Sequence, residues 1–400
     1  MTSVNSLTRS LAVITATALA VTVAGCGGDD DAGAVASGGP IVVAADLELS
    51  GADAAAGQAF QRALELRVDQ LNGSGLAGGR TIKLVVKDNR SDPGESLRNI
   101  QDFSADRAVS AIIMGACAPC AVNAARTLND KAIPAISLAA AGAVASPVAE
   151  RRFMFKLGPN ANDNAAALAA ELSRTPALRK VGLLYTADGY GAEGATALDR
   201  ELGKVGLKLA AKTEVKPTED NLDDPIEQLV ADAPDGILVW TGAEQAVKAA
   251  SAAAEAEYQG RLFLDAAAAG DLFLGGRDGS TPDGTTMVFT QTMVIDDVIA
   301  TTPAKAARKQ WFRDYTARWG SYYGIASFAA DALQLVTDAT LRADADPATP
   351  DRSAIRDQIE MSQMDGLSGP IRLTPDNHSG LMRQSLTMLV ARGGRWRLAG

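Results

Sequence analysis

Short apolar runs alternate with longer segments of helical period along most of the chain. The run IVVAADL at residues 41–47 is followed by a segment that places Phe60, Leu64, Val68 and Leu71 on one helical face. The same alternation continues through TIKLVVKD, SAIIMG and PAIS, with helix-like segments between them. Strand-like runs separated by helical segments are typical of βαβ units. The pattern therefore predicts an α/β fold built on parallel, doubly wound sheets.

A second series of the same kind begins after residues 156–160, where the stretch KLGPN interrupts the pattern. It contains the strand-like runs KVGLLYT, GILVW, RLFLDA and TTMVFT. Helical segments follow at 304–319, 325–342 and about 352–362, before two terminal strand-like runs. A chain of 400 residues that is 47% hydrophobic can bury the cores of two lobes. The repeated series predicts two α/β lobes with a cleft between them.

The N-terminus carries the pattern of an export signal. A polar stretch with Arg9 precedes an apolar run from Leu11 to Ala24, and small residues precede Cys26. The run is shorter than the ~20 residues of a membrane-spanning helix, so we expect a signal peptide over residues 1–25. The stretch VAGC resembles the lipobox of bacterial lipoproteins. That resemblance implies a lipid on the thiol of Cys26, and the alternative is a secreted protein with an unmodified cysteine.

Composition limits the partners of the mature chain. Residues 26–39 are small and acidic, which predicts a flexible tether. The formal net charge is -10, so the phosphates of nucleic acids would be repelled. We therefore expect no nucleic-acid partner.

No motif in the sequence indicates an enzyme. GYGAEG at residues 189–194 fits GxGxxG, but three residues separate it from the strand VGLLY, whereas a dinucleotide site needs its glycines at the turn itself. The single histidine, His378, lies in the turn TPDNHSG, and we expect its side chain to be solvated. We find no calcium loop and no P-loop. The expectation is no catalytic residue, no metal site and no cofactor.

Five stretches resemble, in order, segments of the solute-binding proteins of the branched-chain amino acid type of ABC importer, which have the type I periplasmic-binding fold. They are LSGADAAAGQAFQRALELRVDQLNGSG, KDNRSDPGES, AIPAIS, LYTADGYGAEG and DGLSGPIRLTPD. The resemblance covers roughly residues 40–398. It implies two lobes joined by three crossovers, near residues 156–160, 288–293 and 365–371.

The same resemblance implies how the chain is divided and what it does. The first lobe would comprise residues 40–157 with about 291–366, and the second lobe residues 158–290 with about 367–400. In the family, the lobes close on a small solute and the closed form docks on a membrane permease. The expectation is a monomeric, extracytoplasmic receptor, held to the bacterial cell membrane by its lipid, that delivers an amino acid or related small molecule to an ABC importer. A binding protein that reports its ligand to a signalling partner stays an alternative.

Candidate ligand-binding residues follow from the loops that match the family. Tyr190 matches an aromatic residue that would lie against the ligand, and Asp265 lies near the place where an acidic residue receives an ammonium group. The loops ACAPCA and SLAAAG largely lack the hydroxyls that the family uses, which indicates a more apolar or differently charged solute. The full set is Ser50, Cys117, Ala118, Pro119, Ser137, Ala139, Ala140, Ala141, Tyr190, Ala243 and Asp265.

The stretch CAPC at residues 117–120 lies between a predicted strand and a predicted helix. If Cys26 is acylated, Cys117 and Cys120 remain as a pair, and two cysteines this close should oxidise outside the cytoplasm. We expect a structural disulfide that stiffens the binding loop. Free thiols, a metal site and an extracytoplasmic thiol oxidoreductase stay alternatives, because a helix N-terminus lowers the pKa of a thiol.

Overall fold

Two large sheets carry the fold. The computed structural model describes residues 38–399 except 176, 273, 277 and 278. The expected signal peptide, Cys26 and nearly all of the expected tether lie outside the described residues. Among the helices of the described part, none is long and apolar enough to cross a membrane.

The first sheet is five-stranded, parallel and ordered β2-β1-β3-β4-β5. Alternate residues of β1 point to opposite faces, as the pleat requires. Val43 packs in the cluster that contains α1 and α9, whereas Val42 packs in the cluster that contains α2 and α3. Both faces are therefore covered, which is why β1 reads as a continuous apolar run. The strands are β1 (Ile41–Leu47), β2 (Ile82–Asp88), β3 (Val109–Met114), β4 (Ala135–Ser137) and β5 (Met154–Lys156), and the helices are α1 (Ala54–Ser74), α2 (Pro93–Ala105), α3 (Ala118–Asp130) and α9 (Ala326–Arg342).

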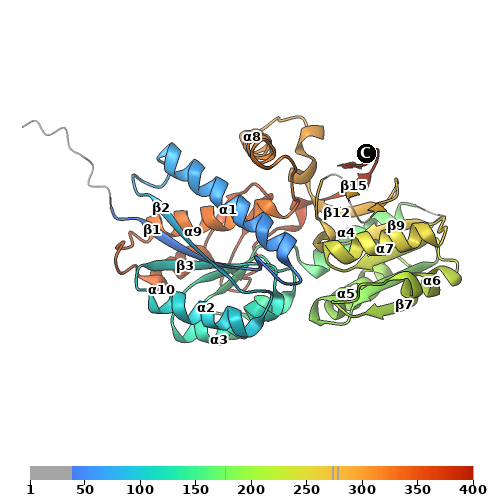
Figure 1. The fold of residues 1–400 in the computed structure, drawn as a ribbon, viewed down its shortest axis with the longest axis horizontal. Helices are drawn as coiled ribbons and strands as arrows, with labels where there is room; N and C mark the ends of the chain where they lie inside the picture. Colours follow the sequence, from blue (N-terminus) through green and yellow to red (C-terminus); the bar gives the residue numbers. More distant parts are fainter. Residues whose placement is uncertain (1–37, 176, 273, 277–278, 400) are drawn as a thin grey trace, which may run out of the picture. The chain divides into compact units, whose positions relative to one another are not determined.

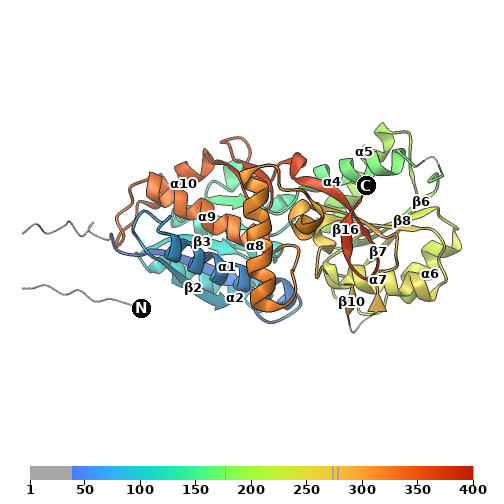
Figure 2. The same ribbon diagram turned by 90° about the horizontal axis from the view of Figure 1, so that it is seen from above.

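The second sheet is seven-stranded and ordered β16-β15-β12-β9-β8-β6-β7. Strands β6 to β9 and β12 are parallel, and β15 and β16 add an antiparallel edge. Helices α4 and α5 cover one face, and α6 and α7 cover the other (labelled in Figure 1, and separated in the view of Figure 2). The strands are β6 (Val181–Thr186), β7 (Leu209–Val215), β8 (Gly236–Trp240), β9 (Arg261–Leu264), β12 (Thr286–Thr290), β15 (Leu386–Ala391) and β16 (Trp396–Leu398), and the helices are α4 (Ala161–Ser173), α5 (Gly189–Lys204), α6 (Asp223–Ala231) and α7 (Ala243–Glu255).

The chain passes between the two sheets three times: after β5, after β12, and before β15. Between the last two passages it returns to the first sheet, where α9 packs on α1 and α10 packs on α9. Helix α8 lies beside α1, with Arg318 paired to Asp69 at 2.6 Å (Figure 2). The predicted fold class, two doubly wound lobes joined by three crossovers, is confirmed. The remaining elements are α8 (Pro303–Trp319), α10 (Arg352–Glu360), β10 (Gly275–Gly276), β11 (Gly279–Ser280), β13 (Gln363–Asp365) and β14 (Pro370–Arg372).

A buried carboxylate holds the last crossover. Asp331, on α9, accepts hydrogen bonds from the amides of Leu367 and Ser368, both at 2.7 Å. The guanidinium of Arg308, on α8, donates to the carbonyl of Gly366 at 2.9 Å. A Cβ atom on Gly366 would lie 2.6 Å from an oxygen of Asp331, so this approach needs glycine. The crossover is therefore anchored to two helices of the first lobe.

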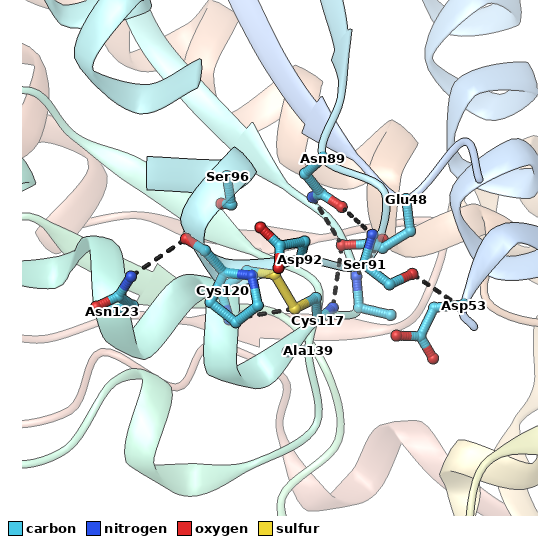
Figure 3. Close-up of a disulfide and its surroundings, with 12 residues drawn as sticks. Glu48, Asp53, Asn89, Ser91, Asp92, Ser96, Cys117, Cys120, Asn123 and Ala139 are labelled. Carbon is cyan, nitrogen blue, oxygen red and sulfur yellow. Dashed lines mark hydrogen bonds between the residues drawn. A yellow bond between two sulfur atoms is a disulfide. The ribbon is translucent and has the colours of Figure 1, made fainter. Parts of the chain in front are cut away.

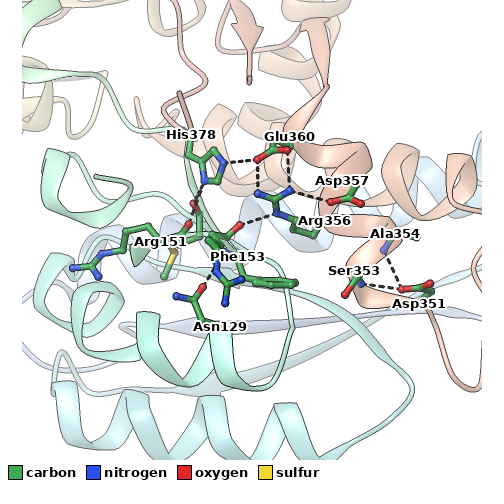
Figure 4. Close-up of polar contacts among 12 residues, drawn as sticks. Asn129, Arg151, Phe153, Asp351, Ser353, Ala354, Arg356, Asp357, Glu360 and His378 are labelled. Atoms are coloured by element: carbon green, nitrogen blue, oxygen red, sulfur yellow. Dashed lines mark hydrogen bonds and ion pairs between the residues drawn. The ribbon is translucent and has the colours of Figure 1, made fainter. Parts of the chain in front are cut away.

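The prediction that His378 is solvated is wrong. Its side chain is buried, with 1% of its surface exposed. Nδ1 lies 2.9 Å from the carbonyl oxygen of Met154, and Nε2 lies 3.0 Å from Oε1 of Glu360, which also binds Arg356 (Figure 4). The turn folds inward because its backbone pairs with β5, where the Lys156 amide donates to the His378 carbonyl at 2.9 Å. The acceptors come from two distant segments, so the local turn pattern did not indicate them.

Replacing His378 removes these contacts and leaves a cavity. We expect His378→Ala to lower the free energy of unfolding by about 2–4 kcal/mol, because a buried ring and the partner of a buried carboxylate are lost. Urea denaturation of the purified protein measures this loss. The control is Asp357→Ala, which removes an exposed ion pair with Arg356 and should cost about 0.5 kcal/mol or less. Equal losses in the two variants would contradict a structural role for His378.

Candidate functional site

The loops that follow the parallel strands of the two sheets face each other. In α/β sheets, ligands bind beyond the carboxyl ends of the strands. Tyr190, in the first turn of α5, packs against the apolar cluster of the first lobe that contains Ala139 and Ala141. Ala118, at the start of α3, packs against the same cluster. The structure therefore brings together predicted residues from both lobes.

A hydrogen bond also joins the lobes. Oε2 of Glu193, on α5, accepts from the amide of Gly142, which follows β4, at 2.7 Å. A Cβ atom on Gly142 would lie 2.5 Å from Oε1 of Glu193, so a larger residue here would displace this carboxylate. Nearby, the buried amine of Lys156 donates to the carbonyl of Pro159 at 3.1 Å. Burial lowers the pKa of Lys156 to about 8, against the opposing effect of Glu193 and Asp163.

The CAPC stretch forms the first turn of α3. Cys117 is the residue that caps the helix, and a disulfide joins it to Cys120 with 5.2 Å between the Cα atoms (Figure 3). Ala118 and Pro119 are the first two helical residues. The two cysteines are 6% and 2% exposed. The structure thus contains the expected disulfide, at the start of α3.

A buried carboxylate supports this turn from inside the first lobe. Glu48 accepts hydrogen bonds from the amides of Ala116 at 2.9 Å and Cys117 at 3.1 Å, and from the side chain of Asn89 at 3.1 Å (Figure 3). Burial raises the pKa of Glu48 to about 7, although these hydrogen bonds act in the opposite direction. A Cβ atom on Gly115 would lie 2.0 Å from Oε2 of Glu48. Glu48 was not among the predicted site residues; the signal for it was an acidic residue directly after a continuous apolar strand.

Two predicted hydroxyls are occupied within the first lobe. Ser50 is exposed, and its hydroxyl donates to Oδ2 of Asp88 at 2.6 Å. Ser137, at the end of β4, is buried, and its hydroxyl accepts from the amide of Ala139 at 3.2 Å. Ala140, the residue after Ala139, is partly exposed. The first lobe therefore offers few free polar side chains to a ligand.

The second lobe contributes a tyrosine and a buried carboxylate. The hydroxyl of Tyr190 donates to Oδ2 of Asp265, which also accepts from the amide of Ala267 at 3.0 Å. The ring of Tyr190 lies 5.8 Å from that of Trp240. Asp265 is fully buried, and within the described part of the chain its Oδ1 has no hydrogen-bond partner. Burial raises the pKa of Asp265 to about 8.

Two glycines of GYGAEG allow α5 to pack closely against the second sheet. A Cβ atom on Gly191 would lie 1.9 Å from the carbonyl oxygen of Thr186, and one on Gly194 would lie 2.1 Å from the ring of Trp240. These glycines let α5 begin close to β6 and hold Tyr190 beside Trp240. Across the residues that the structure describes, no three His, Cys, Asp or Glu side chains form a group that could hold a metal ion.

A cavity of about 510 Å³ lies at this edge of the second sheet. Ala55, from the start of α1, borders it from the first lobe, and Tyr323 borders it from the segment before α9. The predicted residue Ala243 lines it, as does Leu264, which directly precedes Asp265. A volume of this size falls in the range of small-molecule sites, ~300–1,000 Å³. The cavity therefore has walls from both lobes and room for a small solute.

The buried carboxyl of Glu48 predicts a pH dependence. Its pKa is raised in the folded chain, so its contribution to stability is full below the unfolded pKa of ~4.3 and is lost as the pH rises through about 7. We expect the stability of the native protein, relative to Glu48→Gln, to fall by on the order of 3 kcal/mol across that window. Urea denaturation at several pH values measures it. Glu227→Gln, at an exposed position of α6, is the control, and parallel curves for native protein and Glu48→Gln would contradict the prediction.

Known proteins share this architecture. A family model described as periplasmic binding protein matches residues 40–395. An extracellular ligand-binding receptor from Rhodopseudomonas palustris HaA2 is 24% identical, with a TM-score of 0.80, and the match covers 90% of this chain and 99% of that chain. A leucine binding protein, LivK, from Thermotoga maritima MSB8 is 16% identical, with a TM-score of 0.76 and coverage of 90% and 98%.

A further solved structure, 15% identical with a TM-score of 0.77 and coverage of 90% and 96%, is a solute binding protein of an ABC transporter from Rhodopseudomonas palustris BisB5, in complex with 3,4-dihydroxy benzoic acid. No curated protein sequence matches this chain. The family model spans almost all of the described residues, and the two-lobed fold is that of these receptors. The chain therefore belongs to the branched-chain amino acid-binding family of type I periplasmic binding proteins.

Proposed function

We propose that the protein is a lipid-anchored, extracytoplasmic receptor that binds a small solute between its lobes and delivers it to an ABC importer. The observation that carries this proposal is the cavity of about 510 Å³ with walls from both lobes. The hydrogen bond between Glu193 and Gly142 supports it, because it joins a loop of the first lobe to a helix of the second. Residues of the matched loops, Tyr190 and Ala243 among them, would contact the solute.

The lobe division and hinge belong to the same proposal. Residues 40–157 with about 291–366 would move as one body, and residues 158–290 with about 367–400 as the other. The pairing of β12 with β15 in the second sheet supports this division, as does the anchoring of Leu367 by Asp331. Closure would bend the chain at the crossovers and leave both sheets intact.

The relatives support a solute receptor and differ in what they bind. One is titled as a leucine binding protein and another holds 3,4-dihydroxy benzoic acid. In this chain the matched loops of the first lobe have few hydroxyls, and the hydroxyl of Ser137 already accepts a hydrogen bond from the amide of Ala139. We propose a solute that is an amino acid or a related small molecule.

A non-enzymatic role agrees best with the disulfide. A thiol oxidoreductase needs a sulfur atom that a partner thiolate can reach. Cys117 and Cys120 are 6% and 2% exposed, which does not favour exchange with a protein partner. A sensor that reports its ligand to a signalling protein would use the same cleft and remains the second candidate function.

Ligand binding and closure can be tested together. A thermal-shift screen of the chain from residue 27 onward, against amino acids, amides, amines, aromatic acids and sugars, should yield a stabilising solute, because a ligand at a hundred times its Kd adds about 2.7 kcal/mol. Glu193→Ala removes the contact between the lobes, so we expect a larger radius of gyration in small-angle scattering and about 3–10-fold weaker binding of that solute. Asp199→Ala, at an exposed ion pair of the same helix, is the control. If no solute in the screen raised the melting temperature, the result would contradict the receptor function.

The lipid anchor has its own test. In a bacterial host we expect the native chain to sediment with membranes. Because Cys26→Ser removes the acylated thiol, we expect this variant either to remain an uncleaved precursor or, once cleaved, to stay in the soluble fraction. Immunoblots of the fractions measure this. The variant with Cys117→Ser and Cys120→Ser keeps Cys26 and should remain with the membrane. Membrane association of a Cys26→Ser chain that has lost its signal peptide would contradict the anchor.

A further inference from the structure

The walls of the cavity are mostly apolar. Two aromatic side chains, Tyr323 and Trp396, line it together with Val247, Leu264 and Leu274. Such walls suit the apolar or aromatic body of a solute. The faces of aromatic rings also attract a cation.

The charged groups of this lining are mainly acidic. Glu244, in the first turn of α7, and Asp271 both line the cavity. Within the described lining, Lys248 is the single cation, and its amine pairs with Asp220 at 2.8 Å. Asp271 accepts a hydrogen bond from the hydroxyl of Ser321 at 3.2 Å. The described lining therefore holds two acidic side chains and one basic side chain.

Carboxylates of the two lobes approach each other at this cavity. Asp53 precedes α1 in the first lobe, close to the lining residue Ala55. Loss of hydration, and then the carboxylates of Glu244 and Asp188 in the second lobe, raise the pKa of Asp53. Burial, followed by Asp271 and Glu244, likewise raises the pKa of the Tyr323 phenol. Four acidic side chains thus act on one region between the lobes.

A separate observation concerns Asp265. This carboxylate is fully buried, directly follows the lining residue Leu264, and has an Oδ1 atom without a partner in the described chain. An unpaired buried carboxylate oxygen is costly unless a donor reaches it. The amides of Ala116 and Cys117 are not available to a solute carboxylate, since they already donate to Glu48.

Within the class of amino acids and related small molecules, we propose that the solute of this receptor is a relative that lacks the carboxylate: an organic cation with an ammonium or amidinium group on an apolar or aromatic body. The inference rests on the proposed function and names the ligand class of the same cleft. The cationic group lies among Glu244, Asp271 and Asp53, and the body packs against Tyr323 and Trp396.

Charge also couples this ligand class to closure. In this arrangement of the lobes, Glu244 and Asp188 raise the pKa of Asp53, and such repulsion between like charges would oppose closure. A bound cation removes that repulsion, whereas a bound anion adds to it. The solute therefore shifts the population toward the closed form through its differential interaction with the two states.

Calorimetric titration with matched probes tests the proposal. The ammonium probes are isopentylamine and phenethylamine, the zwitterions are leucine and phenylalanine, and the acids are 4-methylpentanoate, 3-phenylpropanoate and 3,4-dihydroxybenzoate. We expect the amines to bind at least about tenfold more tightly than the zwitterions and acids of the same body, with affinity that falls as salt is added. Tighter binding of a zwitterion or an acid would overturn the ligand class and leave the receptor function standing. Failure of every probe and of the wider solute screen would overturn both.

Substitutions of the acidic lining residues test where the cationic group binds. Glu244→Gln should weaken the binding of the amines by about 3–10-fold and leave the affinity for the acids unchanged or slightly higher. Glu255→Gln, at an exposed position near the end of the same helix, is the matched control and should change neither. Unchanged amine affinity in both Glu244→Gln and Asp271→Asn would overturn the placement of the cation in this cavity.

Discussion

Parallel strand pairing decides where a solute can bind in this chain. Every strand from β1 to β5 runs in one direction, as do β6 to β9 and β12, so each sheet gathers its strand-end loops at one edge. The crossovers turn these two edges toward each other. The contacts of Tyr190 and Glu193 with first-lobe residues follow from that arrangement, and so does the cavity between Ala55 and α7.

The sequence predicted those features whose cause is local. Apolar runs such as IVVAADL are buried strands in the structure, and the expected helix at 304–319 is α8. Both could be predicted because the spacing of apolar residues along a short segment indicates its secondary structure. Tyr190 and Asp265, chosen from the resemblance, share a hydrogen bond. Glu48 and His378 were missed or misjudged because their partners lie on segments that only the folded chain brings together.

Buried ionisable groups concentrate at the same edge of the molecule. Glu48, Asp265 and Lys156 are each buried, and burial moves the pKa of each toward neutrality. Such groups cost stability unless they are paired, so their presence beside a cleft favours a functional cause. Glu48 and Lys156 find backbone partners, as Asp331 does at the last crossover, which is a structural role. Asp265 differs, because its Oδ1 has no partner in the described chain.

The two lobes divide the work of recognition. In the first lobe, the disulfide and Glu48 fix the turn at Cys117, and Ser50 and Ser137 direct their hydroxyls to partners within the lobe. This lobe is therefore a preorganised surface with few free polar groups, and it loses little entropy when the lobes close. The second lobe holds Glu244, Asp271 and the unpaired oxygen of Asp265. For the proposed ligand class, these groups would select the solute together with Asp53 of the first lobe.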